Sequence, residues 1–276
     1  MSRGRGTALA TALAGAIAAV CAATLASAES PEPGKATPKN TGQPSSGAFL
    51  VDFSRGYDRH THVLSGWDIN EPWLAASYRP ENVSFDAAGM TLTALRQPTS
   101  VATYTSSEFQ RAGVYGYGRY EVVMRAAAAP GAVAAFFVHT GGFAGDPHDE
   151  VDFEILGRST GSVHTNFFAT GKDTPADHDL GFDAAAADHI YAFEWMPDRI
   201  AWYVDGKLIR EATDATPGIR IPTTTGRVIA SLWVAKGQVT EWVGEPEFAK
   251  ASANFRCMSH VPAGQSGPQC SDTFKP

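Results

Sequence analysis

The sequence has few charged residues, few cysteines and no internal repeat. Charged residues make up 18% and hydrophobic residues 43% of the 276 residues, which excludes a fully disordered chain. The formal net charge of −7 argues against a nucleic-acid partner or an anionic membrane surface, because both call for basic patches. Three cysteines are too few for a disulfide-rich scaffold, and their spacing is not that of zinc ligands.

Residues 1–28 have the pattern of a secretory signal peptide. Arg3 and Arg5 precede an apolar run, and Ala26-Ser27-Ala28 offers the small residues of a cleavage site. An uncleaved anchor is the alternative, because about 18 weakly apolar residues nearly reach membrane length. We expect cleavage, since alanine-rich runs are only mildly hydrophobic. The mature protein would then be secreted or periplasmic, with no membrane partner.

The rest of the chain divides into a linker and one folded domain. Residues 29–48 contain four prolines and no large apolar side chain, which predicts a flexible linker. Residues 49–276 then form a single domain, which we expect to be a monomer. Signal cleavage would remove Cys21 and leave Cys257 and Cys270, which suggest one disulfide in an exported chain, with two free thiols as the alternative.

Short apolar segments bounded by Gly, Pro, Asn or Asp recur along this domain. They are typical of β-strands, and Asp205-Gly206 between two of them predicts a tight hairpin turn. The one helix-like stretch, Asp183–Asp188, is too short to matter. The pattern predicts an all-β sandwich or barrel. The expected strands are Met90–Leu95, Tyr117–Arg125, Val133–His139, Val151–Leu156, Ser162–Phe168, His189–Trp195, Ile200–Val204, Lys207–Ala212 and Arg227–Val234.

The segment His148–Gly157, HDEVDFEILG, is the most informative part of the sequence. Read with the strand period of two, it places Val, Phe and Ile side chains on one face. The other face carries His148 and three carboxylic acids, Glu150, Asp152 and Glu154. The apolar face is expected to pack between the sheets, and the acidic face is then free for chemistry.

Three acids in a row favour glycosidase chemistry. Same-face residues on a strand lie roughly 6.6 Å apart, so like-charge repulsion is expected to raise the pKa of at least one carboxyl. A neutral acid beside a carboxylate is what a glycosidase requires. Solvated surface charge and calcium binding are the alternatives for such a row. Spacing alone leaves open whether the pair is retaining or inverting.

The same segment resembles the catalytic strand of glycoside hydrolase family 16. Three further segments resemble that family in the same order: residues 112–124, the hairpin at 193–206, and Ser231-Leu232-Trp233. The resemblance implies a β-jelly roll (concanavalin A-like) of two curved antiparallel sheets, with a substrate cleft on the concave face. It also implies cleavage of internal β-glycosidic bonds with retention. Position by position, Glu150 matches the nucleophile, Glu154 the general acid/base, and Asp152 the residue that tunes the nucleophile.

The resemblance also implies sugar-binding side chains near the acids. Asn166 and Trp233 match cleft residues of lichenases, and Glu108 matches a substrate-contacting glutamate. His148 resembles the transglycosylase and exopolysaccharide-hydrolase versions of the motif. Trp195 and Trp202 are expected in the core, and Trp67 and Trp73 flank a loop that could edge the cleft. The full set expected to bind substrate is Glu108, His148, His164, Asn166, Phe168 and Trp233.

The expected function is therefore that of a secreted retaining endo-β-glycanase acting on a polysaccharide. Mixed-linkage β-1,3-1,4-glucan or a related exopolysaccharide is the expected substrate. A xyloglucan-type transglycosylase and a non-catalytic glycan-binding module are the alternatives. No cofactor or catalytic metal is expected. The analogy with lichenases suggests a structural calcium ion, for which the sequence offers no convincing ligand set.

Overall fold

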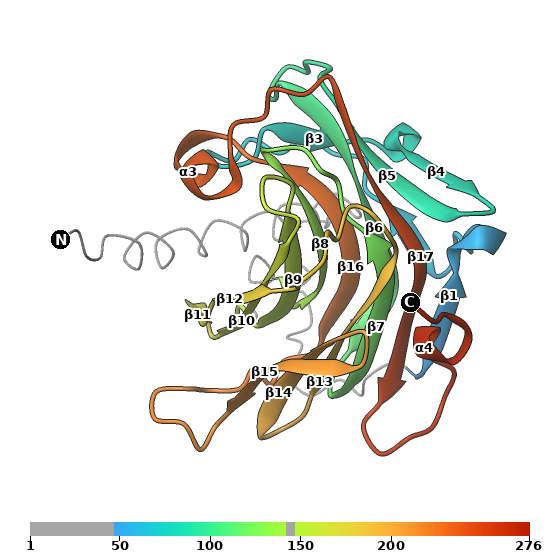
Figure 1. Cartoon of the computed structure of the whole chain (residues 1–276), viewed down its shortest axis with the longest axis vertical. Helices are drawn as coiled ribbons and strands as arrows, with labels where there is room; N and C mark the ends of the chain where they lie inside the picture. Colours follow the sequence, from blue (N-terminus) through green and yellow to red (C-terminus); the bar gives the residue numbers. More distant parts are fainter. Residues whose placement is uncertain (1–46, 142–146) are drawn as a thin grey trace, which may run out of the picture.

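The computed structural model describes residues 47–141 and 147–276. The predicted signal peptide and nearly all of the predicted linker lie outside the described residues. Two curved β-sheets stack face to face in the described part of the chain (Figure 1). All strand pairs but one are antiparallel, and only short helices accompany them, which confirms the predicted all-β jelly-roll fold.

The first sheet carries the acids and runs in the order β2-β6-β16-β8-β9-β10-β12, with β11 beside the end of β10. Its central strands, β8 and β9, are buried along their whole length. The side chains of β8 are almost all apolar, as expected for a strand covered on both faces, whereas β9 alternates apolar side chains with the three acids. The bounds are β2 His62–Leu64, β6 Tyr104–Tyr115, β16 Gly226–Val234, β8 Ala132–His139, β9 Glu150–Leu156, β10 Ser162–Ala169, β11 Lys172–Asp173 and β12 Ala176–Asp179.

The second sheet runs in the order β4-β5-β17-β7-β13-β14-β15, with β1 continuing the β5 side of β17. Strand β6 joins the two sheets, because its first residues pair with β3 and β5 and its later residues with β16. The bounds are β1 Phe49–Asp52, β3 Ala76–Tyr78, β4 Val83–Asp86, β5 Gly89–Leu95, β7 Gly118–Arg125, β13 His189–Trp195, β14 Arg199–Val204, β15 Lys207–Thr213 and β17 Lys250–Pro262.

Aromatic rings from both sheets meet in the core. Phe136 of β8 lies 5.8 Å from Phe193 of β13, and Phe153 of β9 lies 5.6 Å from Tyr191 (ring centroids). All four rings are fully buried. Burial of one such side chain contributes roughly 2 kcal/mol to stability, so this layer fixes β9 against the opposite sheet. Trp195 and Trp202 are also buried in this core, as expected.

The predicted hairpin between β14 and β15 is confirmed. Its two turn residues, Asp205 and Gly206, have positive φ angles of 49° and 79°. A two-residue hairpin turn with both central residues in this region matches the twist of its strands. Glycine and aspartate tolerate that conformation better than most residues, which explains the choice of sequence.

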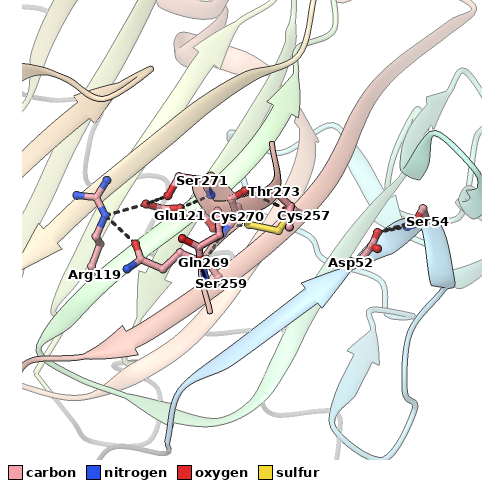
Figure 2. Close-up of a disulfide and its surroundings, with 11 residues drawn as sticks. Asp52, Ser54, Arg119, Glu121, Cys257, Ser259, Gln269, Cys270, Ser271 and Thr273 are labelled. Carbon is pink, nitrogen blue, oxygen red and sulfur yellow. Dashed lines mark hydrogen bonds and ion pairs between the residues drawn. A yellow bond between two sulfur atoms is a disulfide. The ribbon is translucent and has the colours of Figure 1, made fainter. Parts of the chain in front are cut away.

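The C-terminal segment is tied to the second sheet by a disulfide and a buried carboxylate (Figure 2). Cys257 of β17 and Cys270 of the short helix α4 (Cys270–Thr273) are bonded, with their Cα atoms 5.8 Å apart. The buried Glu121 accepts hydrogen bonds from Arg119 Nε at 2.7 Å and from the backbone N of Ser271 at 2.8 Å. These contacts compensate the cost of burying the Glu121 charge.

The other helices of the described residues are single turns. They are α3 (Thr240–Val243) and the 3-10 turns η2 (Phe53–Arg55), η3 (Pro80–Asn82) and η5 (Gly237–Val239). The stretch Asp183–Asp188 forms turns instead of a helix. Between residues 47 and 276, outside the gap at 142–146, no helix has the length and apolarity needed to span a membrane.

Candidate active site

Strand β9 places the three acids on the face opposite the core. Val151, Phe153 and Ile155 are buried in the main core cluster, whereas the acids between them point to the other side of the sheet. The acids themselves are nearly inaccessible: Glu150 is 1%, Asp152 3% and Glu154 2% exposed. Carboxyls at this depth need partners, because burying an unpaired charge is costly. The row is therefore not solvated surface charge.

Pairing with the neighbouring strands sets what each acid meets. Glu150 lies opposite His139 of β8 and Phe168 of β10. Asp152 lies between Phe137 and Asn166, and Glu154 lies between Ala135 and His164. A second line of paired residues runs across the strands, from Glu154 through Ala135 to Ser231 of β16 and then to Glu108 of β6. Three strand spacings put Glu108 roughly 14 Å from Glu154.

Two imidazoles surround Glu150. His148 Nε2 lies 2.7 Å and His139 Nδ1 lies 3.3 Å from Glu150 Oε2. Burial opposes ionisation of Glu150, but the two histidines outweigh it and hold the pKa of this carboxyl below its usual range. The His148 ring is itself stacked on Phe168, with centroids 4.2 Å apart. Glu150 is thus kept as a carboxylate, the form that a nucleophile requires.

The surroundings of Glu154 have the opposite effect. Its Oε1 accepts a hydrogen bond of 3.1 Å from Trp233 Nε1, and its Oε2 has no hydrogen-bond partner. Burial raises the pKa of Glu154 to about 7, although His164 and the Trp233 hydrogen bond counteract it. At neutral pH a large share of this carboxyl therefore carries a proton, which suits a general acid.

Asp152 lies between the two glutamates. Burial first, and then the charges of Glu150 and Glu154, raise its pKa well above the usual value, so Asp152 is protonated. The neighbouring Glu150 side chain also favours the protonated form of Asp152, and Asp152 Oδ2 and Glu150 Oε1 are both buried without a hydrogen-bond partner. A proton on Asp152 thus stabilises the negative charge of Glu150 without adding a charge of its own.

Strand β9 is also held from the core side. Trp202 of β14, in the opposite sheet, donates a hydrogen bond of 3.1 Å from Nε1 to the backbone oxygen of Asp152. Arg210 of β15 stacks on Trp202, 4.6 Å from the ring centroid, and donates to the backbone oxygens of Thr165 and Thr174 at 2.9 and 2.7 Å. Trp202 therefore holds β9 from the core side, while Arg210 holds the neighbouring strand β10 and packs on Trp202.

A match to known proteins accords with this arrangement of acids. Residues 70–252 match the family model described as glycosyl hydrolases family 16. The chain belongs to this family. It is 39% identical over 199 residues to a beta-glucanase of Bacillus subtilis, which covers 72% of this chain and 79% of that protein. The family 16 protein is thus a glycosidase, which excludes the alternative of a non-catalytic glycan-binding module.

Solved structures agree with the family. The Bacillus licheniformis beta-glucanase has a TM-score of 0.73 and 33% identity, covering 79% of this chain and 99% of that one. A prokaryotic beta-1,3-1,4-glucanase (lichenase) derived from a mouse hindgut metagenome has a TM-score of 0.72 and 32% identity, covering 78% of this chain and 99% of that one. The fold of the family 16 protein is that of these glucanases.

The side chains predicted to bind sugar lie on the same face as the acids, but most are buried. Phe168 is covered by His148 and is 1% exposed, so it supports that histidine. Asn166 Oδ1 accepts from the backbone N of Phe167 and Thr174, whereas its Nδ2 is buried without a partner. Nδ2 is therefore the part of the Asn166 side chain that no protein atom satisfies.

Glu108 belongs to a separate polar network on β6. It accepts hydrogen bonds of 2.7 Å from Ser65 Oγ and from Gln110 Nε2. Gln110 Oε1 in turn accepts from Arg227 at 3.0 Å. Burial raises the pKa of Glu108 to about 7, which these hydrogen bonds and Arg227 counteract. This network lies three strands away from Glu154, at the other end of the line of paired residues that joins Glu154 to Glu108.

Three residues near the acids were not singled out by the sequence. His139 contacts Glu150, Asp177 pairs with His164 at 2.8 Å, and Trp242 lies 4.9 Å from the His164 ring. Trp233 lies between Trp73 and Trp242, at 5.8 and 6.5 Å between ring centroids. His139 ends a predicted strand and could have been placed by pairing β8 with β9; Trp242 and Asp177 carry no comparable signal.

Proposed function

We propose that this family 16 protein is a secreted endo-β-glucanase that hydrolyses internal β-glucosidic bonds by retaining double displacement. Mixed-linkage β-1,3-1,4-glucan or a closely related polysaccharide is the proposed substrate. One observation carries the proposal: the same strand face holds Glu150 as a carboxylate between two imidazoles and Glu154 as a buried acid with a raised pKa. The related proteins are a beta-glucanase and a lichenase, which supports the choice of substrate.

In the first half of the proposed reaction, Glu154 gives its proton to the glycosidic oxygen while Glu150 attacks the anomeric carbon. The bond to the leaving sugar breaks, and a covalent glycosyl-Glu150 ester forms. In the second half, the ionised Glu154 takes a proton from water, and the resulting hydroxide displaces Glu150. Protonated Asp152 stabilises the Glu150 carboxylate before the attack and after its release.

Aromatic side chains near Glu154 are suited to hold the sugar chain. Trp73, Trp233 and Trp242 form a cluster beside the acid, in which Trp73 and Trp233 are buried and Trp242 is partly exposed. Flat indole faces bind the apolar faces of sugar rings, and free N–H groups bind their hydroxyls. The proposed subsites therefore lie along the partly exposed Trp242, which Trp233 supports from below, on the Glu154 side of β9.

The decisive experiment removes Glu150 and supplies a replacement nucleophile. Glu150→Ala is expected to lose glucan cleavage by at least about 10⁴-fold and to form a glycosyl azide of inverted configuration when azide and an activated aryl glucoside are added. Glu154→Ala is the matched control, because azide would give the retained configuration there. Undiminished activity in Glu150→Ala, or inverted product from the parent enzyme, would refute the mechanism.

The substrate is tested with a panel of lichenan, xyloglucan, carboxymethyl-cellulose, laminarin and an acidic exopolysaccharide. Lichenan is expected to give the highest kcat/KM, with Glu150→Ala as the blank. Products longer than the donor fragments, detected by mass spectrometry with an added oligosaccharide acceptor, would identify a transglycosylase instead. Exclusively shorter products support hydrolysis.

A further inference from the structure

We propose that His139, His148 and Glu150 form a binding site for a divalent transition-metal ion, with zinc as the best fit, and that the bound ion blocks the enzyme. One ligand atom from each residue lies within 4.8 Å of the other two. Two imidazoles and one carboxylate are a typical zinc ligand set that leaves a further position for water. The site shares Glu150 with the proposed glycosidase chemistry, which assigns no metal ion to that carboxyl.

The unsatisfied nitrogens of His139 point to a ligand. The residue is 1% exposed, yet neither Nδ1 nor Nε2 has a hydrogen-bond partner of good geometry. A buried polar atom without a partner is costly, and such atoms are rare in folded proteins. Nδ1 lies 3.3 Å from Glu150 Oε2. Two ligands of one tetrahedral zinc ion are separated by roughly the same distance, about 3.3 Å.

The other two ligands are already oriented. The His148 ring is stacked on Phe168 and is edge-on to His139, with ring centroids 4.2 and 5.2 Å apart. Glu150 Oε2 contacts both histidines, and its Oε1 has no hydrogen-bond partner. Ligands held before binding lower the entropy cost of capturing the ion. The distance between His148 Nε2 and Glu150 Oε2 has to increase only slightly from 2.7 Å for the ion to fit between them.

Access is from the acidic face through His148. Its side chain is 15% exposed, whereas those of His139 and Glu150 are fully buried. An ion bound there would withdraw the electron pair of Glu150 from the anomeric carbon, so binding and cleavage exclude one another. This inhibitory consequence rests on the proposed nucleophilic role of Glu150; the binding site itself does not.

Zinc binding is measured first, by competition with a chromophoric chelator on the full chain. The parent is expected to bind one ion at this site. His139→Phe and His148→Gln are expected to bind it at least about 10-fold more weakly, and His139→Cys to regain binding through its thiolate. His60→Gln, which removes an exposed histidine on a turn, is the matched control and is expected to bind as the parent does. Circular dichroism melts identify any variant that fails to fold.

Equal zinc affinity in the parent, His139→Phe and His148→Gln would overturn the site. Activity is then measured with zinc and after addition of a chelator. Reversible inhibition of the parent, with at least about 10-fold less sensitivity in His139→Phe, is the expected result. Zinc binding at this site without inhibition would overturn the blocking effect and count against Glu150 as the nucleophile, while the metal site would stand.

Discussion

The indole of Trp233 donates a hydrogen bond to the carboxyl of Glu154. Trp233 lies on β16 and Glu154 on β9, so the bond reaches across the intervening strand β8. The donor favours the ionised form of Glu154, whereas burial favours the protonated form. The balance places the pKa of Glu154 at about 7. One aromatic side chain thus influences the pH range in which the acid keeps its proton.

Replacing Trp233 by Phe is expected to move the basic limb of the pH profile upward. In the parent, kcat/KM should fall as pH rises through about 7, because Glu154 must be protonated in the first step. Removing the donor raises the pKa of Glu154 further, so the fall occurs at higher pH. The measurement is kcat/KM on lichenan from pH 4 to 9.

Trp242→Phe is the control for this change. Trp242 contacts Trp233 and His164, but no hydrogen bond joins it to Glu154. Its substitution should alter KM without moving the limb. An unmoved limb in Trp233→Phe would contradict the assignment of Glu154 as the acid.

Asp152 is expected to act as a hydrogen-bond donor to Glu150. Asp152→Asn keeps an N–H donor at this position, whereas Asp152→Ala leaves the buried Glu150 oxygen without one. We expect Asp152→Asn to retain at least about 10-fold more kcat than Asp152→Ala, which corresponds to about 1.4 kcal/mol. Equal losses in both variants would show that the position contributes by shape or charge instead.

Glu108 is expected to make stability depend on pH. Its pKa in the folded protein is about 7, above the ordinary value of 4.5. A raised carboxyl pKa stabilises the fold below pH 4.5, and this contribution is lost as pH rises toward 7. Glu108→Gln removes the titrating group, so it should gain stability relative to the parent between pH 5 and pH 8, by on the order of 1–3 kcal/mol.

The comparison uses chemical denaturation of both proteins at the two pH values, so that other titrating groups cancel in the difference. Glutamine can still accept hydrogen bonds from Ser65, which keeps the packing comparable. A pH-independent difference between parent and variant would mean that Glu108 ionises in the fold as it does in water.

The disulfide is expected to stabilise the domain without affecting catalysis. The bond closes a separation of 13 residues, which corresponds to about 3 kcal/mol in the chain-entropy model. Replacing Cys257 and Cys270 together by Ser should lower Tm by roughly 5–10 °C. Since the disulfide lies on the second sheet, away from the acids of β9, kcat at 25 °C should stay at the parent value. A large fall in kcat with an unchanged Tm would contradict the purely stabilising role of the disulfide.

The nine strands expected from the sequence are all present, and their bounds differ from the observed ones by at most one residue at either end. They were predictable because each carries a dense apolar pattern between turn residues. The long strands β6 and β17 were missed. Strand β6 reads YTSSEFQRAGVY and β17 reads KASANFRCMSHVP. Their polar residues are buried by pairing on both sides, which local patterning does not reveal.

The row of acids was predictable because side chains alternate between the two faces of a strand, which puts Glu150, Asp152 and Glu154 on the same face. Their different protonation states were not. These depend on His139 and Trp233, which come from β8 and β16 and reach the acids only through sheet pairing. Phe168 and Trp233 are both buried under neighbouring aromatic rings, which strand alternation does not reveal, and their part in binding substrate stays a prediction.

The bracing of β9 by Trp202, and of the neighbouring β10 by Arg210, has a consequence for how the enzyme responds to heat. Both residues belong to the opposite sheet, so the acids hold their places only while the two sheets remain packed together. Because these contacts come from the opposite sheet, we expect β9 to lose its structure together with the rest of the domain. Residual activity after heating then reports the folded fraction directly.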